Sequence, residues 1–347
     1  MSAEEIRIGI VGAGGIVRSR HIPGFKKIPG VRLVGVANRT PESSERAAQE
    51  FGIEKTFPSW EELVRSDEID TVVIGTWPYM HCPVTLAALD AGKHVFCQAR
   101  MCMNYAEAVR MTEAARRSDR VTMLCPPPVG MVGDYQMRDL LDSGRIGEIR
   151  SIHLRAMSNQ LVDPDVPFHW RQDRELSGYN TLTVGIYAEV IHRWFGQASR
   201  IASVVRVFTA RRQTADGKGT REVLVPDAVF VCAEMACGAL ANLQWSGVAP
   251  FPEPNLIEAH GSKGTLRYML DTDEIYCGCV GDEKMERVPI PPERARHWTV
   301  ERDFIDAIRE GKPVSPSFED GLEYMEFTEP VIRSGEQKCS IDLPLIG

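Results

Sequence analysis

The chain has 347 residues, more than one hydrophobic core usually serves, so two domains are expected. Its formal net charge of −8 is spread along the chain, which argues against nucleic acid or an anionic membrane as the main partner. The nine cysteines follow no disulfide framework or metal-ligand spacing, and no apolar stretch is long enough to span a membrane. These features predict a cytoplasmic protein with reduced thiols, no metal and a small-molecule ligand.

The first predicted strand runs into a glycine-rich turn in the stretch IRIGIVGAGGIV. Gly12 permits a tight turn, and Gly14 lets a backbone approach a pyrophosphate. Gly15 and Ile16 begin a predicted helix whose N–H groups face the anion. Val17 holds the third glycine position, which predicts a slightly wider spacing between helix and strand. The motif predicts a dinucleotide site, and a purely structural turn is the alternative.

The second predicted strand, VRLVGVAN, ends at Asn38, where an acidic residue commonly binds the ribose 2′-hydroxyl of NAD. A carboxylate there would repel a 2′-phosphate. Neutral Asn38, beside Arg39 and Thr40, can instead accept one through charge-assisted hydrogen bonds. The sequence therefore favours NADP over NAD. The alternative is that Arg39 is a solvated turn residue and NAD binds through Asn38.

Further strand and helix patterns alternate up to residue 126. Strands are predicted in IDTVVIGT, KHVFC and VTMLCP, and helices at about 82–91 and 105–117. This alternation predicts a Rossmann domain, residues 1–126, with a doubly wound parallel sheet. Ligands of such sheets bind beyond the carboxyl ends of the strands. Cofactor contacts are therefore predicted at Thr76, Trp77, His81, Gln98 and Pro126, with the nicotinamide near 126–128.

Residues 127–347 predict an α+β domain for substrate binding and oligomerisation. Successive strand-like runs separated by turn signals indicate a large, mostly antiparallel sheet, interrupted by a helix at about 181–195. Residues 213–221 are expected to form an exposed hairpin or loop. Two amphipathic helices near the C-terminus are expected to pack back on the Rossmann domain. The open face of the sheet is expected to pair with another copy in a dimer or tetramer.

The ordered motifs resemble the Gfo/Idh/MocA family, typified by glucose-fructose oxidoreductase and inositol dehydrogenase, along nearly the whole chain. The resemblance rests on GIVGAGGI, ALDAGKHVFC, LLDSGRIGEI, HWRQDRELSGYNTLTVGIY and FIDAIREGKPVSPSFEDGLEYME. It implies hydride transfer between NAD(P) and a carbinol or carbonyl carbon of a sugar, cyclic polyol or dihydrodiol.

Two catalytic motifs depart from the usual family pattern. The family usually has Glu-Lys-Pro, whose lysine contacts the reacting hydroxyl, where this chain has Gln98, Ala99 and Arg100. A second motif, commonly Asp-x-Gly-x-His, is here TVGIY, from Thr183 to Tyr187. Members similar to glucose-fructose oxidoreductase and dihydrodiol dehydrogenase share Gly-Ile-Tyr, which implies that Tyr187 is the acid/base.

A tyrosine whose pKa is near 10 needs a nearby cation to act as a base at neutral pH. With no lysine at position 99, the candidates for that charge are Arg100, His169, Arg171 and His81. Substrate contacts are predicted at Trp170, Arg171 and Thr183. The alternatives are that Tyr187 is a core tyrosine and Arg100 pairs with a surface carboxylate.

Three functions remain open on this basis: an oxidoreductase, a dinucleotide-binding sensor that no longer turns over, and a lyase or epimerase that uses the cofactor transiently.

A non-proline cis peptide bond costs about 3 kcal/mol, so the Ala99–Arg100 bond is predicted to be trans.

Overall fold

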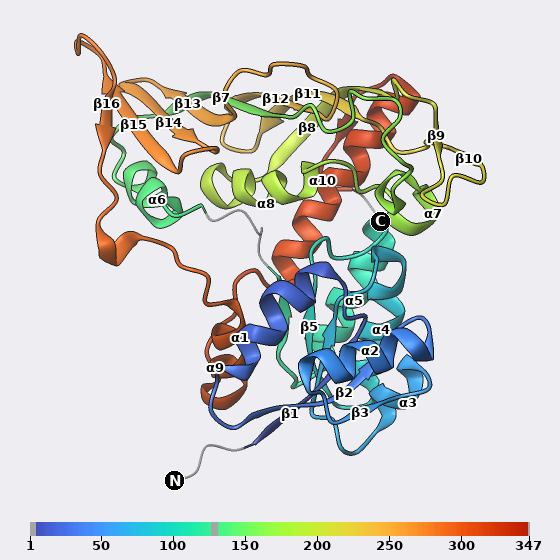
Figure 1. Cartoon of the computed structure of the whole chain (residues 1–347). Coiled ribbons are helices and arrows are strands. Elements are labelled where there is room, and N and C mark those ends of the chain that lie inside the picture. Colours follow the sequence, from blue (N-terminus) through green and yellow to red (C-terminus); the bar gives the residue numbers. More distant parts are fainter. Residues whose placement is uncertain (1–4, 126–130, 346–347) are drawn as a thin grey trace. The chain divides into compact units, whose positions relative to one another are not determined.

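The structure, a computed structural model, describes residues 5–125 and 131–345 (Figure 1). It divides into two compact units. The first consists of Met1–Pro126 and Thr299–Met325, and the second of Pro127–Trp298 and Glu326–Gly347. The chain therefore returns to the first unit after completing most of the second.

The first unit contains a six-stranded sheet in the order β3-β2-β1-β4-β5-β6. All neighbouring strands are parallel, which confirms the predicted doubly wound Rossmann sheet. Its central strands are apolar on both faces because helices flank the sheet, and Ile8 and Ile10 are fully buried (Figure 1). The strands are β1 (Ile6–Val11), β2 (Val31–Ala37), β3 (Lys55–Thr56), β4 (Thr71–Ile74), β5 (His94–Cys97) and β6 (Thr122–Leu124).

Helix starts in this unit follow local sequence signals. Thr40, Ser59 and Asn104 each accept a hydrogen bond from a backbone N–H in the first turn of the helix that follows. The helical segments are η1 (Val17–His21), α1 (Ile22–Lys26), α2 (Pro41–Phe51), α3 (Trp60–Arg65), η2 (Pro78–Met80), α4 (His81–Asp90), α5 (Tyr105–Arg117) and α9 (Val300–Glu310). The helix predicted at 105–117 therefore has the bounds of α5.

The second unit contains a nine-stranded sheet in the order β16-β15-β14-β13-β7-β12-β11-β8-β17. The mostly antiparallel sheet is confirmed, with one parallel pair, β7 with β12. Nothing in the alternating strand patterns marks that pair. The strands are β7 (Ile149–Met157), β8 (Ala198–Arg206), β11 (Ala228–Met235), β12 (Leu240–Ser246), β13 (Leu256–Gly261), β14 (Gly264–Met269), β15 (Glu274–Cys279), β16 (Glu286–Val288) and β17 (Ile341–Asp342).

Helices α6 (Asp134–Asp142) and α8 (Val184–Phe195) lie on one side of this sheet (Figure 1). Alternate residues of β11 are buried, as expected for a strand with one covered face. We call the opposite side the outward sheet face; Val204, Phe230 and Leu240 are exposed there on three neighbouring strands. Shorter helical segments are η3 (Trp170–Gln172), α7 (Arg174–Ser177) and η4 (Pro292–Arg294), and α10 (Phe318–Gln337) has residues in both units.

A separate two-stranded ribbon confirms the predicted hairpin: β9 (Arg211–Gln213) pairs antiparallel with β10 (Thr220–Glu222). Within the described part of the chain, every helix is too short or too polar to cross a membrane.

Candidate functional site

The glycine turn after β1 forms a cradle that side chains would fill. Gly12 has φ +84°, and a Cβ on it would lie 2.8 Å from the backbone nitrogen of Thr76. A Cβ on Gly14 would lie 3.2 Å from the carbonyl oxygen of Gly75, whereas one on Gly15 would meet no atom within 4 Å. Gly12 is therefore required by the turn itself, and Gly15 borders open space. These residues fit the pyrophosphate of a dinucleotide.

The helical run after the turn is not a regular α-helix. It begins at Gly15 and Ile16 and continues as a π-helix, η1, that ends at His21. Such turns are rare and often occur at functional sites. Val17 is fully buried, and its side chain occupies space that a Cβ on Gly75 would need. The valine at the third glycine position is thus accommodated because Gly75 has no side chain.

Asn38 fastens the glycine turn to the end of β2. Its Oδ1 accepts a hydrogen bond from the N–H of Ala13 at 2.7 Å, and its Nδ2 donates to the carbonyl of Ser43 at 2.8 Å. Both ends of the amide are therefore engaged within the protein. This gives Asn38 a structural role that the sequence analysis did not anticipate.

Arg39 is exposed, and its guanidinium lies 5.7 Å from the centroid of the Trp77 ring. Within residues 5–125 and 131–345 it forms no ion pair with a carboxylate. Thr40, the third residue of this predicted group, caps α2. The structure thus brings Arg39 and Trp77 together and leaves the Arg39 charge available to an anion. Pro126, the last predicted cofactor contact, lies outside the described residues.

The loop after β5 corrects one expectation. The Ala99–Arg100 peptide bond is cis, so the predicted trans bond is wrong. The prediction considered the peptide bond alone, whereas tertiary contacts hold this loop. Nδ1 of His81 lies 2.9 Å from the carbonyl oxygen of Arg100, and the N–H of Met101 donates to the Tyr324 hydroxyl. Arg100 is only 8% exposed, so it is not a surface residue.

His81 is a poor candidate for a cation. Burial lowers its pKa, and it is 1% exposed. Its Nε2 lies 3.0 Å from the carbonyl oxygen of Thr76, so both ring nitrogens face backbone carbonyls. His81 therefore ties the ends of β4 and β5 together.

A buried chain of side chains, which the sequence analysis missed, reaches Gln98. His21 Nδ1 lies 2.5 Å from Oε1 of Glu301, and His21 Nε2 faces the amide nitrogen of Gln98. His21 is 0% exposed and Glu301 4%. The one local signal was a histidine shortly after the glycine turn in an otherwise amphipathic helix. Its partner Glu301 lies 280 residues away in α9.

In the second unit, Tyr187 lies on α8 and is 6% exposed. Its hydroxyl has no hydrogen bond to any other residue in the described ranges. Burial, followed by the charges of Asp271 and Asp273, raises the pKa of Tyr187 to about 12. This direction of the pKa shift is opposite to the one expected for a base, because burial and, to a smaller extent, two acidic neighbours favour the protonated phenol. Thr183 precedes α8 and accepts the N–H of Tyr187 at 3.0 Å.

The predicted substrate residues of the HWR stretch form one cluster. The Arg171 guanidinium lies 4.4 Å from the centroid of the Trp170 ring, and the ring centroids of His169 and Trp170 are 5.4 Å apart. Nδ1 of His169 accepts the N–H of Arg171 at 3.2 Å. Partial burial, and then the Arg171 charge, lower the pKa of His169. His169 is therefore neutral at neutral pH, and Arg171 is the charged member of the cluster.

Arg212, also missed from the sequence, organises the segment that precedes this cluster. Its side chain is 2% exposed and donates to the carbonyl oxygens of Leu161, Asp163 and Val166 at 2.7, 2.8 and 3.0 Å. A guanidinium has several N–H donors, so a buried arginine can satisfy them by donating to backbone carbonyls that surround it. Arg212 therefore fixes the path of the chain toward His169.

Comparison with known proteins places these features in a family. Residues 6–125 match the model of an oxidoreductase family with an NAD-binding Rossmann fold, and residues 135–267 match the GFO/IDH/MocA C-terminal domain. A levoglucosan dehydrogenase of Pseudarthrobacter phenanthrenivorans is 25% identical over 395 aligned positions, covering 99% of each chain. A myo-inositol 2-dehydrogenase of Thermotoga maritima is 24% identical and covers 97% of this chain and 98% of its own.

The fold agrees with that assignment. A solved structure of levoglucosan dehydrogenase with NADH and levoglucosan has a TM-score of 0.86 at 22% identity, covering 99% of this chain and 100% of that one. Both of the relatives described above are named as dehydrogenases. The chain belongs to the Gfo/Idh/MocA family of NAD(P)-dependent oxidoreductases.

Proposed function

We propose that Tyr187 is the proton carrier of this oxidoreductase. The observation that carries the proposal is the hydroxyl of this 6% exposed residue, which has no hydrogen-bond partner among the described residues and therefore remains available to a ligand. Tyrosine at this position also agrees with the Gly-Ile-Tyr variant of the family motif. A core tyrosine kept only for packing normally has its hydroxyl paired, as Tyr268 does with Asp273.

The raised pKa of Tyr187 sets the favoured direction of proton transfer. At neutral pH the phenol is protonated and acts as a donor. A reduced dinucleotide, when bound, would supply a hydride. Tyr187 would donate its phenol proton to the substrate oxygen, so that a carbonyl becomes an alcohol. The phenolate then regains a proton from water. We infer that the chain reduces a carbonyl near neutral pH and oxidises the alcohol only at alkaline pH.

We infer that the dinucleotide is NADP rather than NAD. Arg39 is exposed and forms no ion pair in the described structure, and Asn38 brings no negative charge. A 2′-phosphate beside Arg39 would gain a charge-assisted hydrogen bond that NAD cannot make. NAD remains the alternative. Fluorescence titration with NADPH and NADH decides between them by comparing their dissociation constants.

The substrate class follows from the His169, Trp170 and Arg171 cluster. The indole of Trp170 offers an apolar face, and the His169 imidazole and the Arg171 guanidinium offer N–H donors. This combination suits a hydroxylated ring, such as a sugar, a cyclic polyol or a dihydrodiol. The names of the levoglucosan and inositol dehydrogenases that resemble this chain support the same class. Turnover on a panel of the three substrate classes and their carbonyl forms, with both cofactors, tests the proposal.

The alternative is a dinucleotide-binding sensor that has lost turnover. Two observations favour it: Ala99 replaces the lysine of the usual motif, and the charges that shift the pKa of Tyr187 are acidic. In that case a sugar or polyol would bind and alter cofactor affinity without any oxidation or reduction. Absence of turnover across the whole panel, with cofactor binding intact, would establish this alternative.

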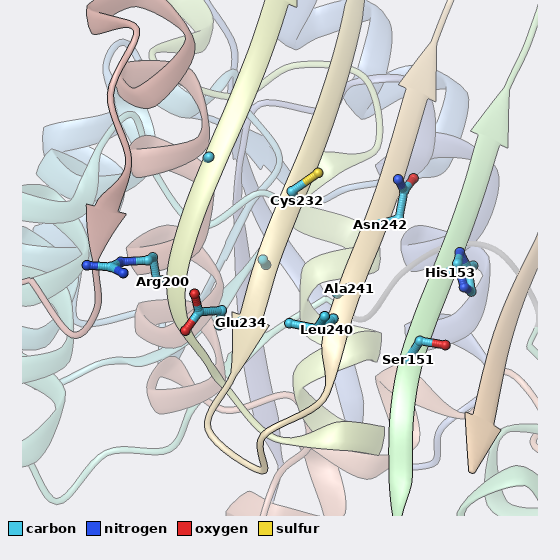
Figure 2. Close-up of a pocket in the computed structure, with 10 residues that line it drawn as sticks. Ser151, His153, Arg200, Cys232, Glu234, Leu240, Ala241 and Asn242 are labelled. Carbon is cyan, nitrogen blue, oxygen red and sulfur yellow. The ribbon is translucent and has the colours of Figure 1, made fainter. Parts of the chain in front are cut away.

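We further propose that a second copy of the chain covers the outward sheet face. Val204, Phe230 and Leu240 are 67%, 43% and 62% exposed on β8, β11 and β12. A hollow of about 370 Å³ lies on this face. Figure 2 shows Arg200, Glu234 and Leu240 among the residues that line it. Arg200 and Glu234 are register partners, so each copy offers both signs of charge to a symmetric neighbour.

Reduced thiols support a cytoplasmic location, which we also propose. All nine cysteines are thiols in the structure, and five of them are buried. The thiols of cytosolic proteins are kept reduced by the reducing systems of that compartment. Alkylation of protein taken directly from cells, followed by mass spectrometry, tests whether all nine carry the label.

A further inference from the structure

The Gln98 side chain contacts a buried histidine, and the other ring nitrogen of that histidine contacts a buried carboxylate. Glu301 contacts Nδ1 of His21, and Nε2 of the same ring contacts the amide nitrogen of Gln98. All three side chains are less than 10% exposed. The chain of contacts therefore runs from α9 to the end of β5, where a Rossmann sheet binds its ligand.

The chemistry of each group fixes the direction of these hydrogen bonds. A carboxylate accepts only, so Nδ1 of His21 must carry the proton that faces Glu301. A neutral ring then has a lone pair on Nε2, which needs a donor. The donor of a glutamine is its NH₂ group, and that group faces Nε2. The carbonyl oxygen of Gln98 is consequently turned away from His21.

The surroundings are built to keep Glu301 and His21 in place. A Cβ on Gly24 would lie 2.6 Å from Cδ of Glu301, so only glycine leaves room for the carboxylate beside α1. Glu301 also lies in the first turn of α9, where the helix dipole stabilises a negative charge. The edge of the His21 ring packs on Phe96, with ring centroids 4.9 Å apart.

We propose that Glu301 and His21 are positioning residues that orient the Gln98 amide, so that its oxygen is offered to the carboxamide of the bound nicotinamide. The inference rests on the proposed dinucleotide function and adds a control on Gln98. The family usually has glutamate at position 98. A carboxylate there would need a proton on Nε2, and His21 would become an imidazolium between two acids. Glutamine keeps the same contact with a neutral ring.

The protonation of His21 is testable without cofactor or activity. The chain has eight histidines, so selective ¹⁵N-histidine labelling gives a tractable NMR spectrum, and loss of a signal in His21→Asn assigns the residue. The contacts with Glu301 and Gln98 predict a ring that carries its proton on Nδ1 and a lone pair on Nε2. An imidazolium, or a proton on Nε2, would overturn the proposal.

A charge-changing variant tests the link to position 98. In Gln98→Glu the His21 signals should become those of an imidazolium at neutral pH. Among the described residues, the titratable groups near the ring include Glu301, the Cys125 thiol 3.8 Å from Nε2, and Arg20 one residue earlier. Burial raises the pKa of Cys125, so the thiol stays protonated at neutral pH. A His21 ring that remains neutral in Gln98→Glu would contradict the proposed coupling.

Cofactor affinity then separates positioning from packing. Glu301→Gln keeps an acceptor for Nδ1 and should bind NADPH within about twofold of wild type, whereas Glu301→Met and Gln98→Met should each weaken binding about five- to tenfold. The double variant Glu301→Met/Gln98→Met should bind no more weakly than either single variant. Multiplied losses in the double variant, or equal losses in Glu301→Gln and Glu301→Met, would refute the proposal.

Different results would contradict the proposed dinucleotide function and the positioning role of Glu301 and His21. If wild type binds neither NADPH nor NADH, the proposed function fails, and the NMR measurements still decide the state of His21. If wild type binds and the His21 or double-variant results disagree, only the positioning role fails. Should Glu301→Met not fold, as judged by its circular dichroism, the Gln98→Glu spectrum and the affinity of Glu301→Gln decide. An affinity loss above about twofold in Glu301→Gln would overturn the positioning role.

Discussion

Replacing Tyr187 by phenylalanine should remove turnover without loss of stability. The hydroxyl has no hydrogen-bond partner in the described structure, so its removal leaves no group unpaired. The free energy of unfolding at neutral pH should therefore stay within about 0.5 kcal/mol of wild type. Loss of a positioned acid typically lowers the rate by about 10² to 10⁴. Cofactor affinity should not change, because the phenol acts only where the proton moves.

The pKa of Tyr187 gives this prediction a magnitude and a pH dependence. A rise from 10.0 to about 12 disfavours the phenolate by about 3 kcal/mol. Alcohol oxidation, which needs the phenolate, should rise about tenfold per pH unit above neutrality, whereas carbonyl reduction should be flat until the phenol ionises. Because the folded pKa is raised, the stability that Tyr187 contributes is complete below pH 10 and is lost as pH rises toward 12.

The assay compares wild type, Tyr187→Phe and a matched control, Tyr268→Phe, by pH–rate profiles and urea unfolding. The Tyr268 hydroxyl donates to Asp273 and accepts the N–H of Gly133 at 3.2 Å. Its removal should cost about 1 to 3 kcal/mol of stability by leaving these groups unpaired, with less effect on turnover. Undiminished turnover in Tyr187→Phe would refute the assignment. A destabilisation like that of Tyr268→Phe would show that Tyr187 is a bonded core residue.

Three further predictions concern the cofactor, the fold and the assembly. Arg39→Ala should weaken NADPH binding by about 1 to 3 kcal/mol and leave NADH unchanged in a fluorescence titration; equal losses would contradict the 2′-phosphate role. Asp134→Ala should lower the free energy of unfolding in urea by about 3 to 5 kcal/mol, because it strands the charges of Arg193 and Arg296, and a loss below 1 kcal/mol would exclude a structural ion cluster. Leu240→Glu should reduce the mass measured by light scattering to that of one chain, and an unchanged oligomer would place the interface elsewhere.

The nucleotide-binding half was predictable because local signals and tertiary structure agree there. The predicted strands there are continuous apolar stretches of the sequence. The residues before α2 and α5 have side chains that cap helix N-termini well. The glycine turn was predictable for a related reason. Gly12 has a positive φ and a close backbone neighbour in Thr76, and both restrict the position to glycine.

What the sequence did not reveal depends on contacts between distant residues. Glu301 and His21 are 280 positions apart, and the sequence around each residue gives no indication that the two are in contact. Arg212 reads as one more charged residue in a hairpin, yet it is buried beneath three carbonyls. The parallel pairing of β7 with β12 has the same alternation as its antiparallel neighbours. Such features follow from which elements meet, and periodicity in one segment does not determine that.

The departures from the usual catalytic motif change the proton chemistry in one direction. Ala99 removes an ammonium, and the neutral rings of His81 and His169 do not replace it. Asp271 and Asp273 add negative charge near Tyr187, which holds the proton on the phenol more firmly. A base is weakened by each of these features, whereas an acid needs none of the missing groups. If Tyr187 is the proton carrier, as proposed, these features favour delivery of a proton to a carbonyl over removal of a proton from an alcohol.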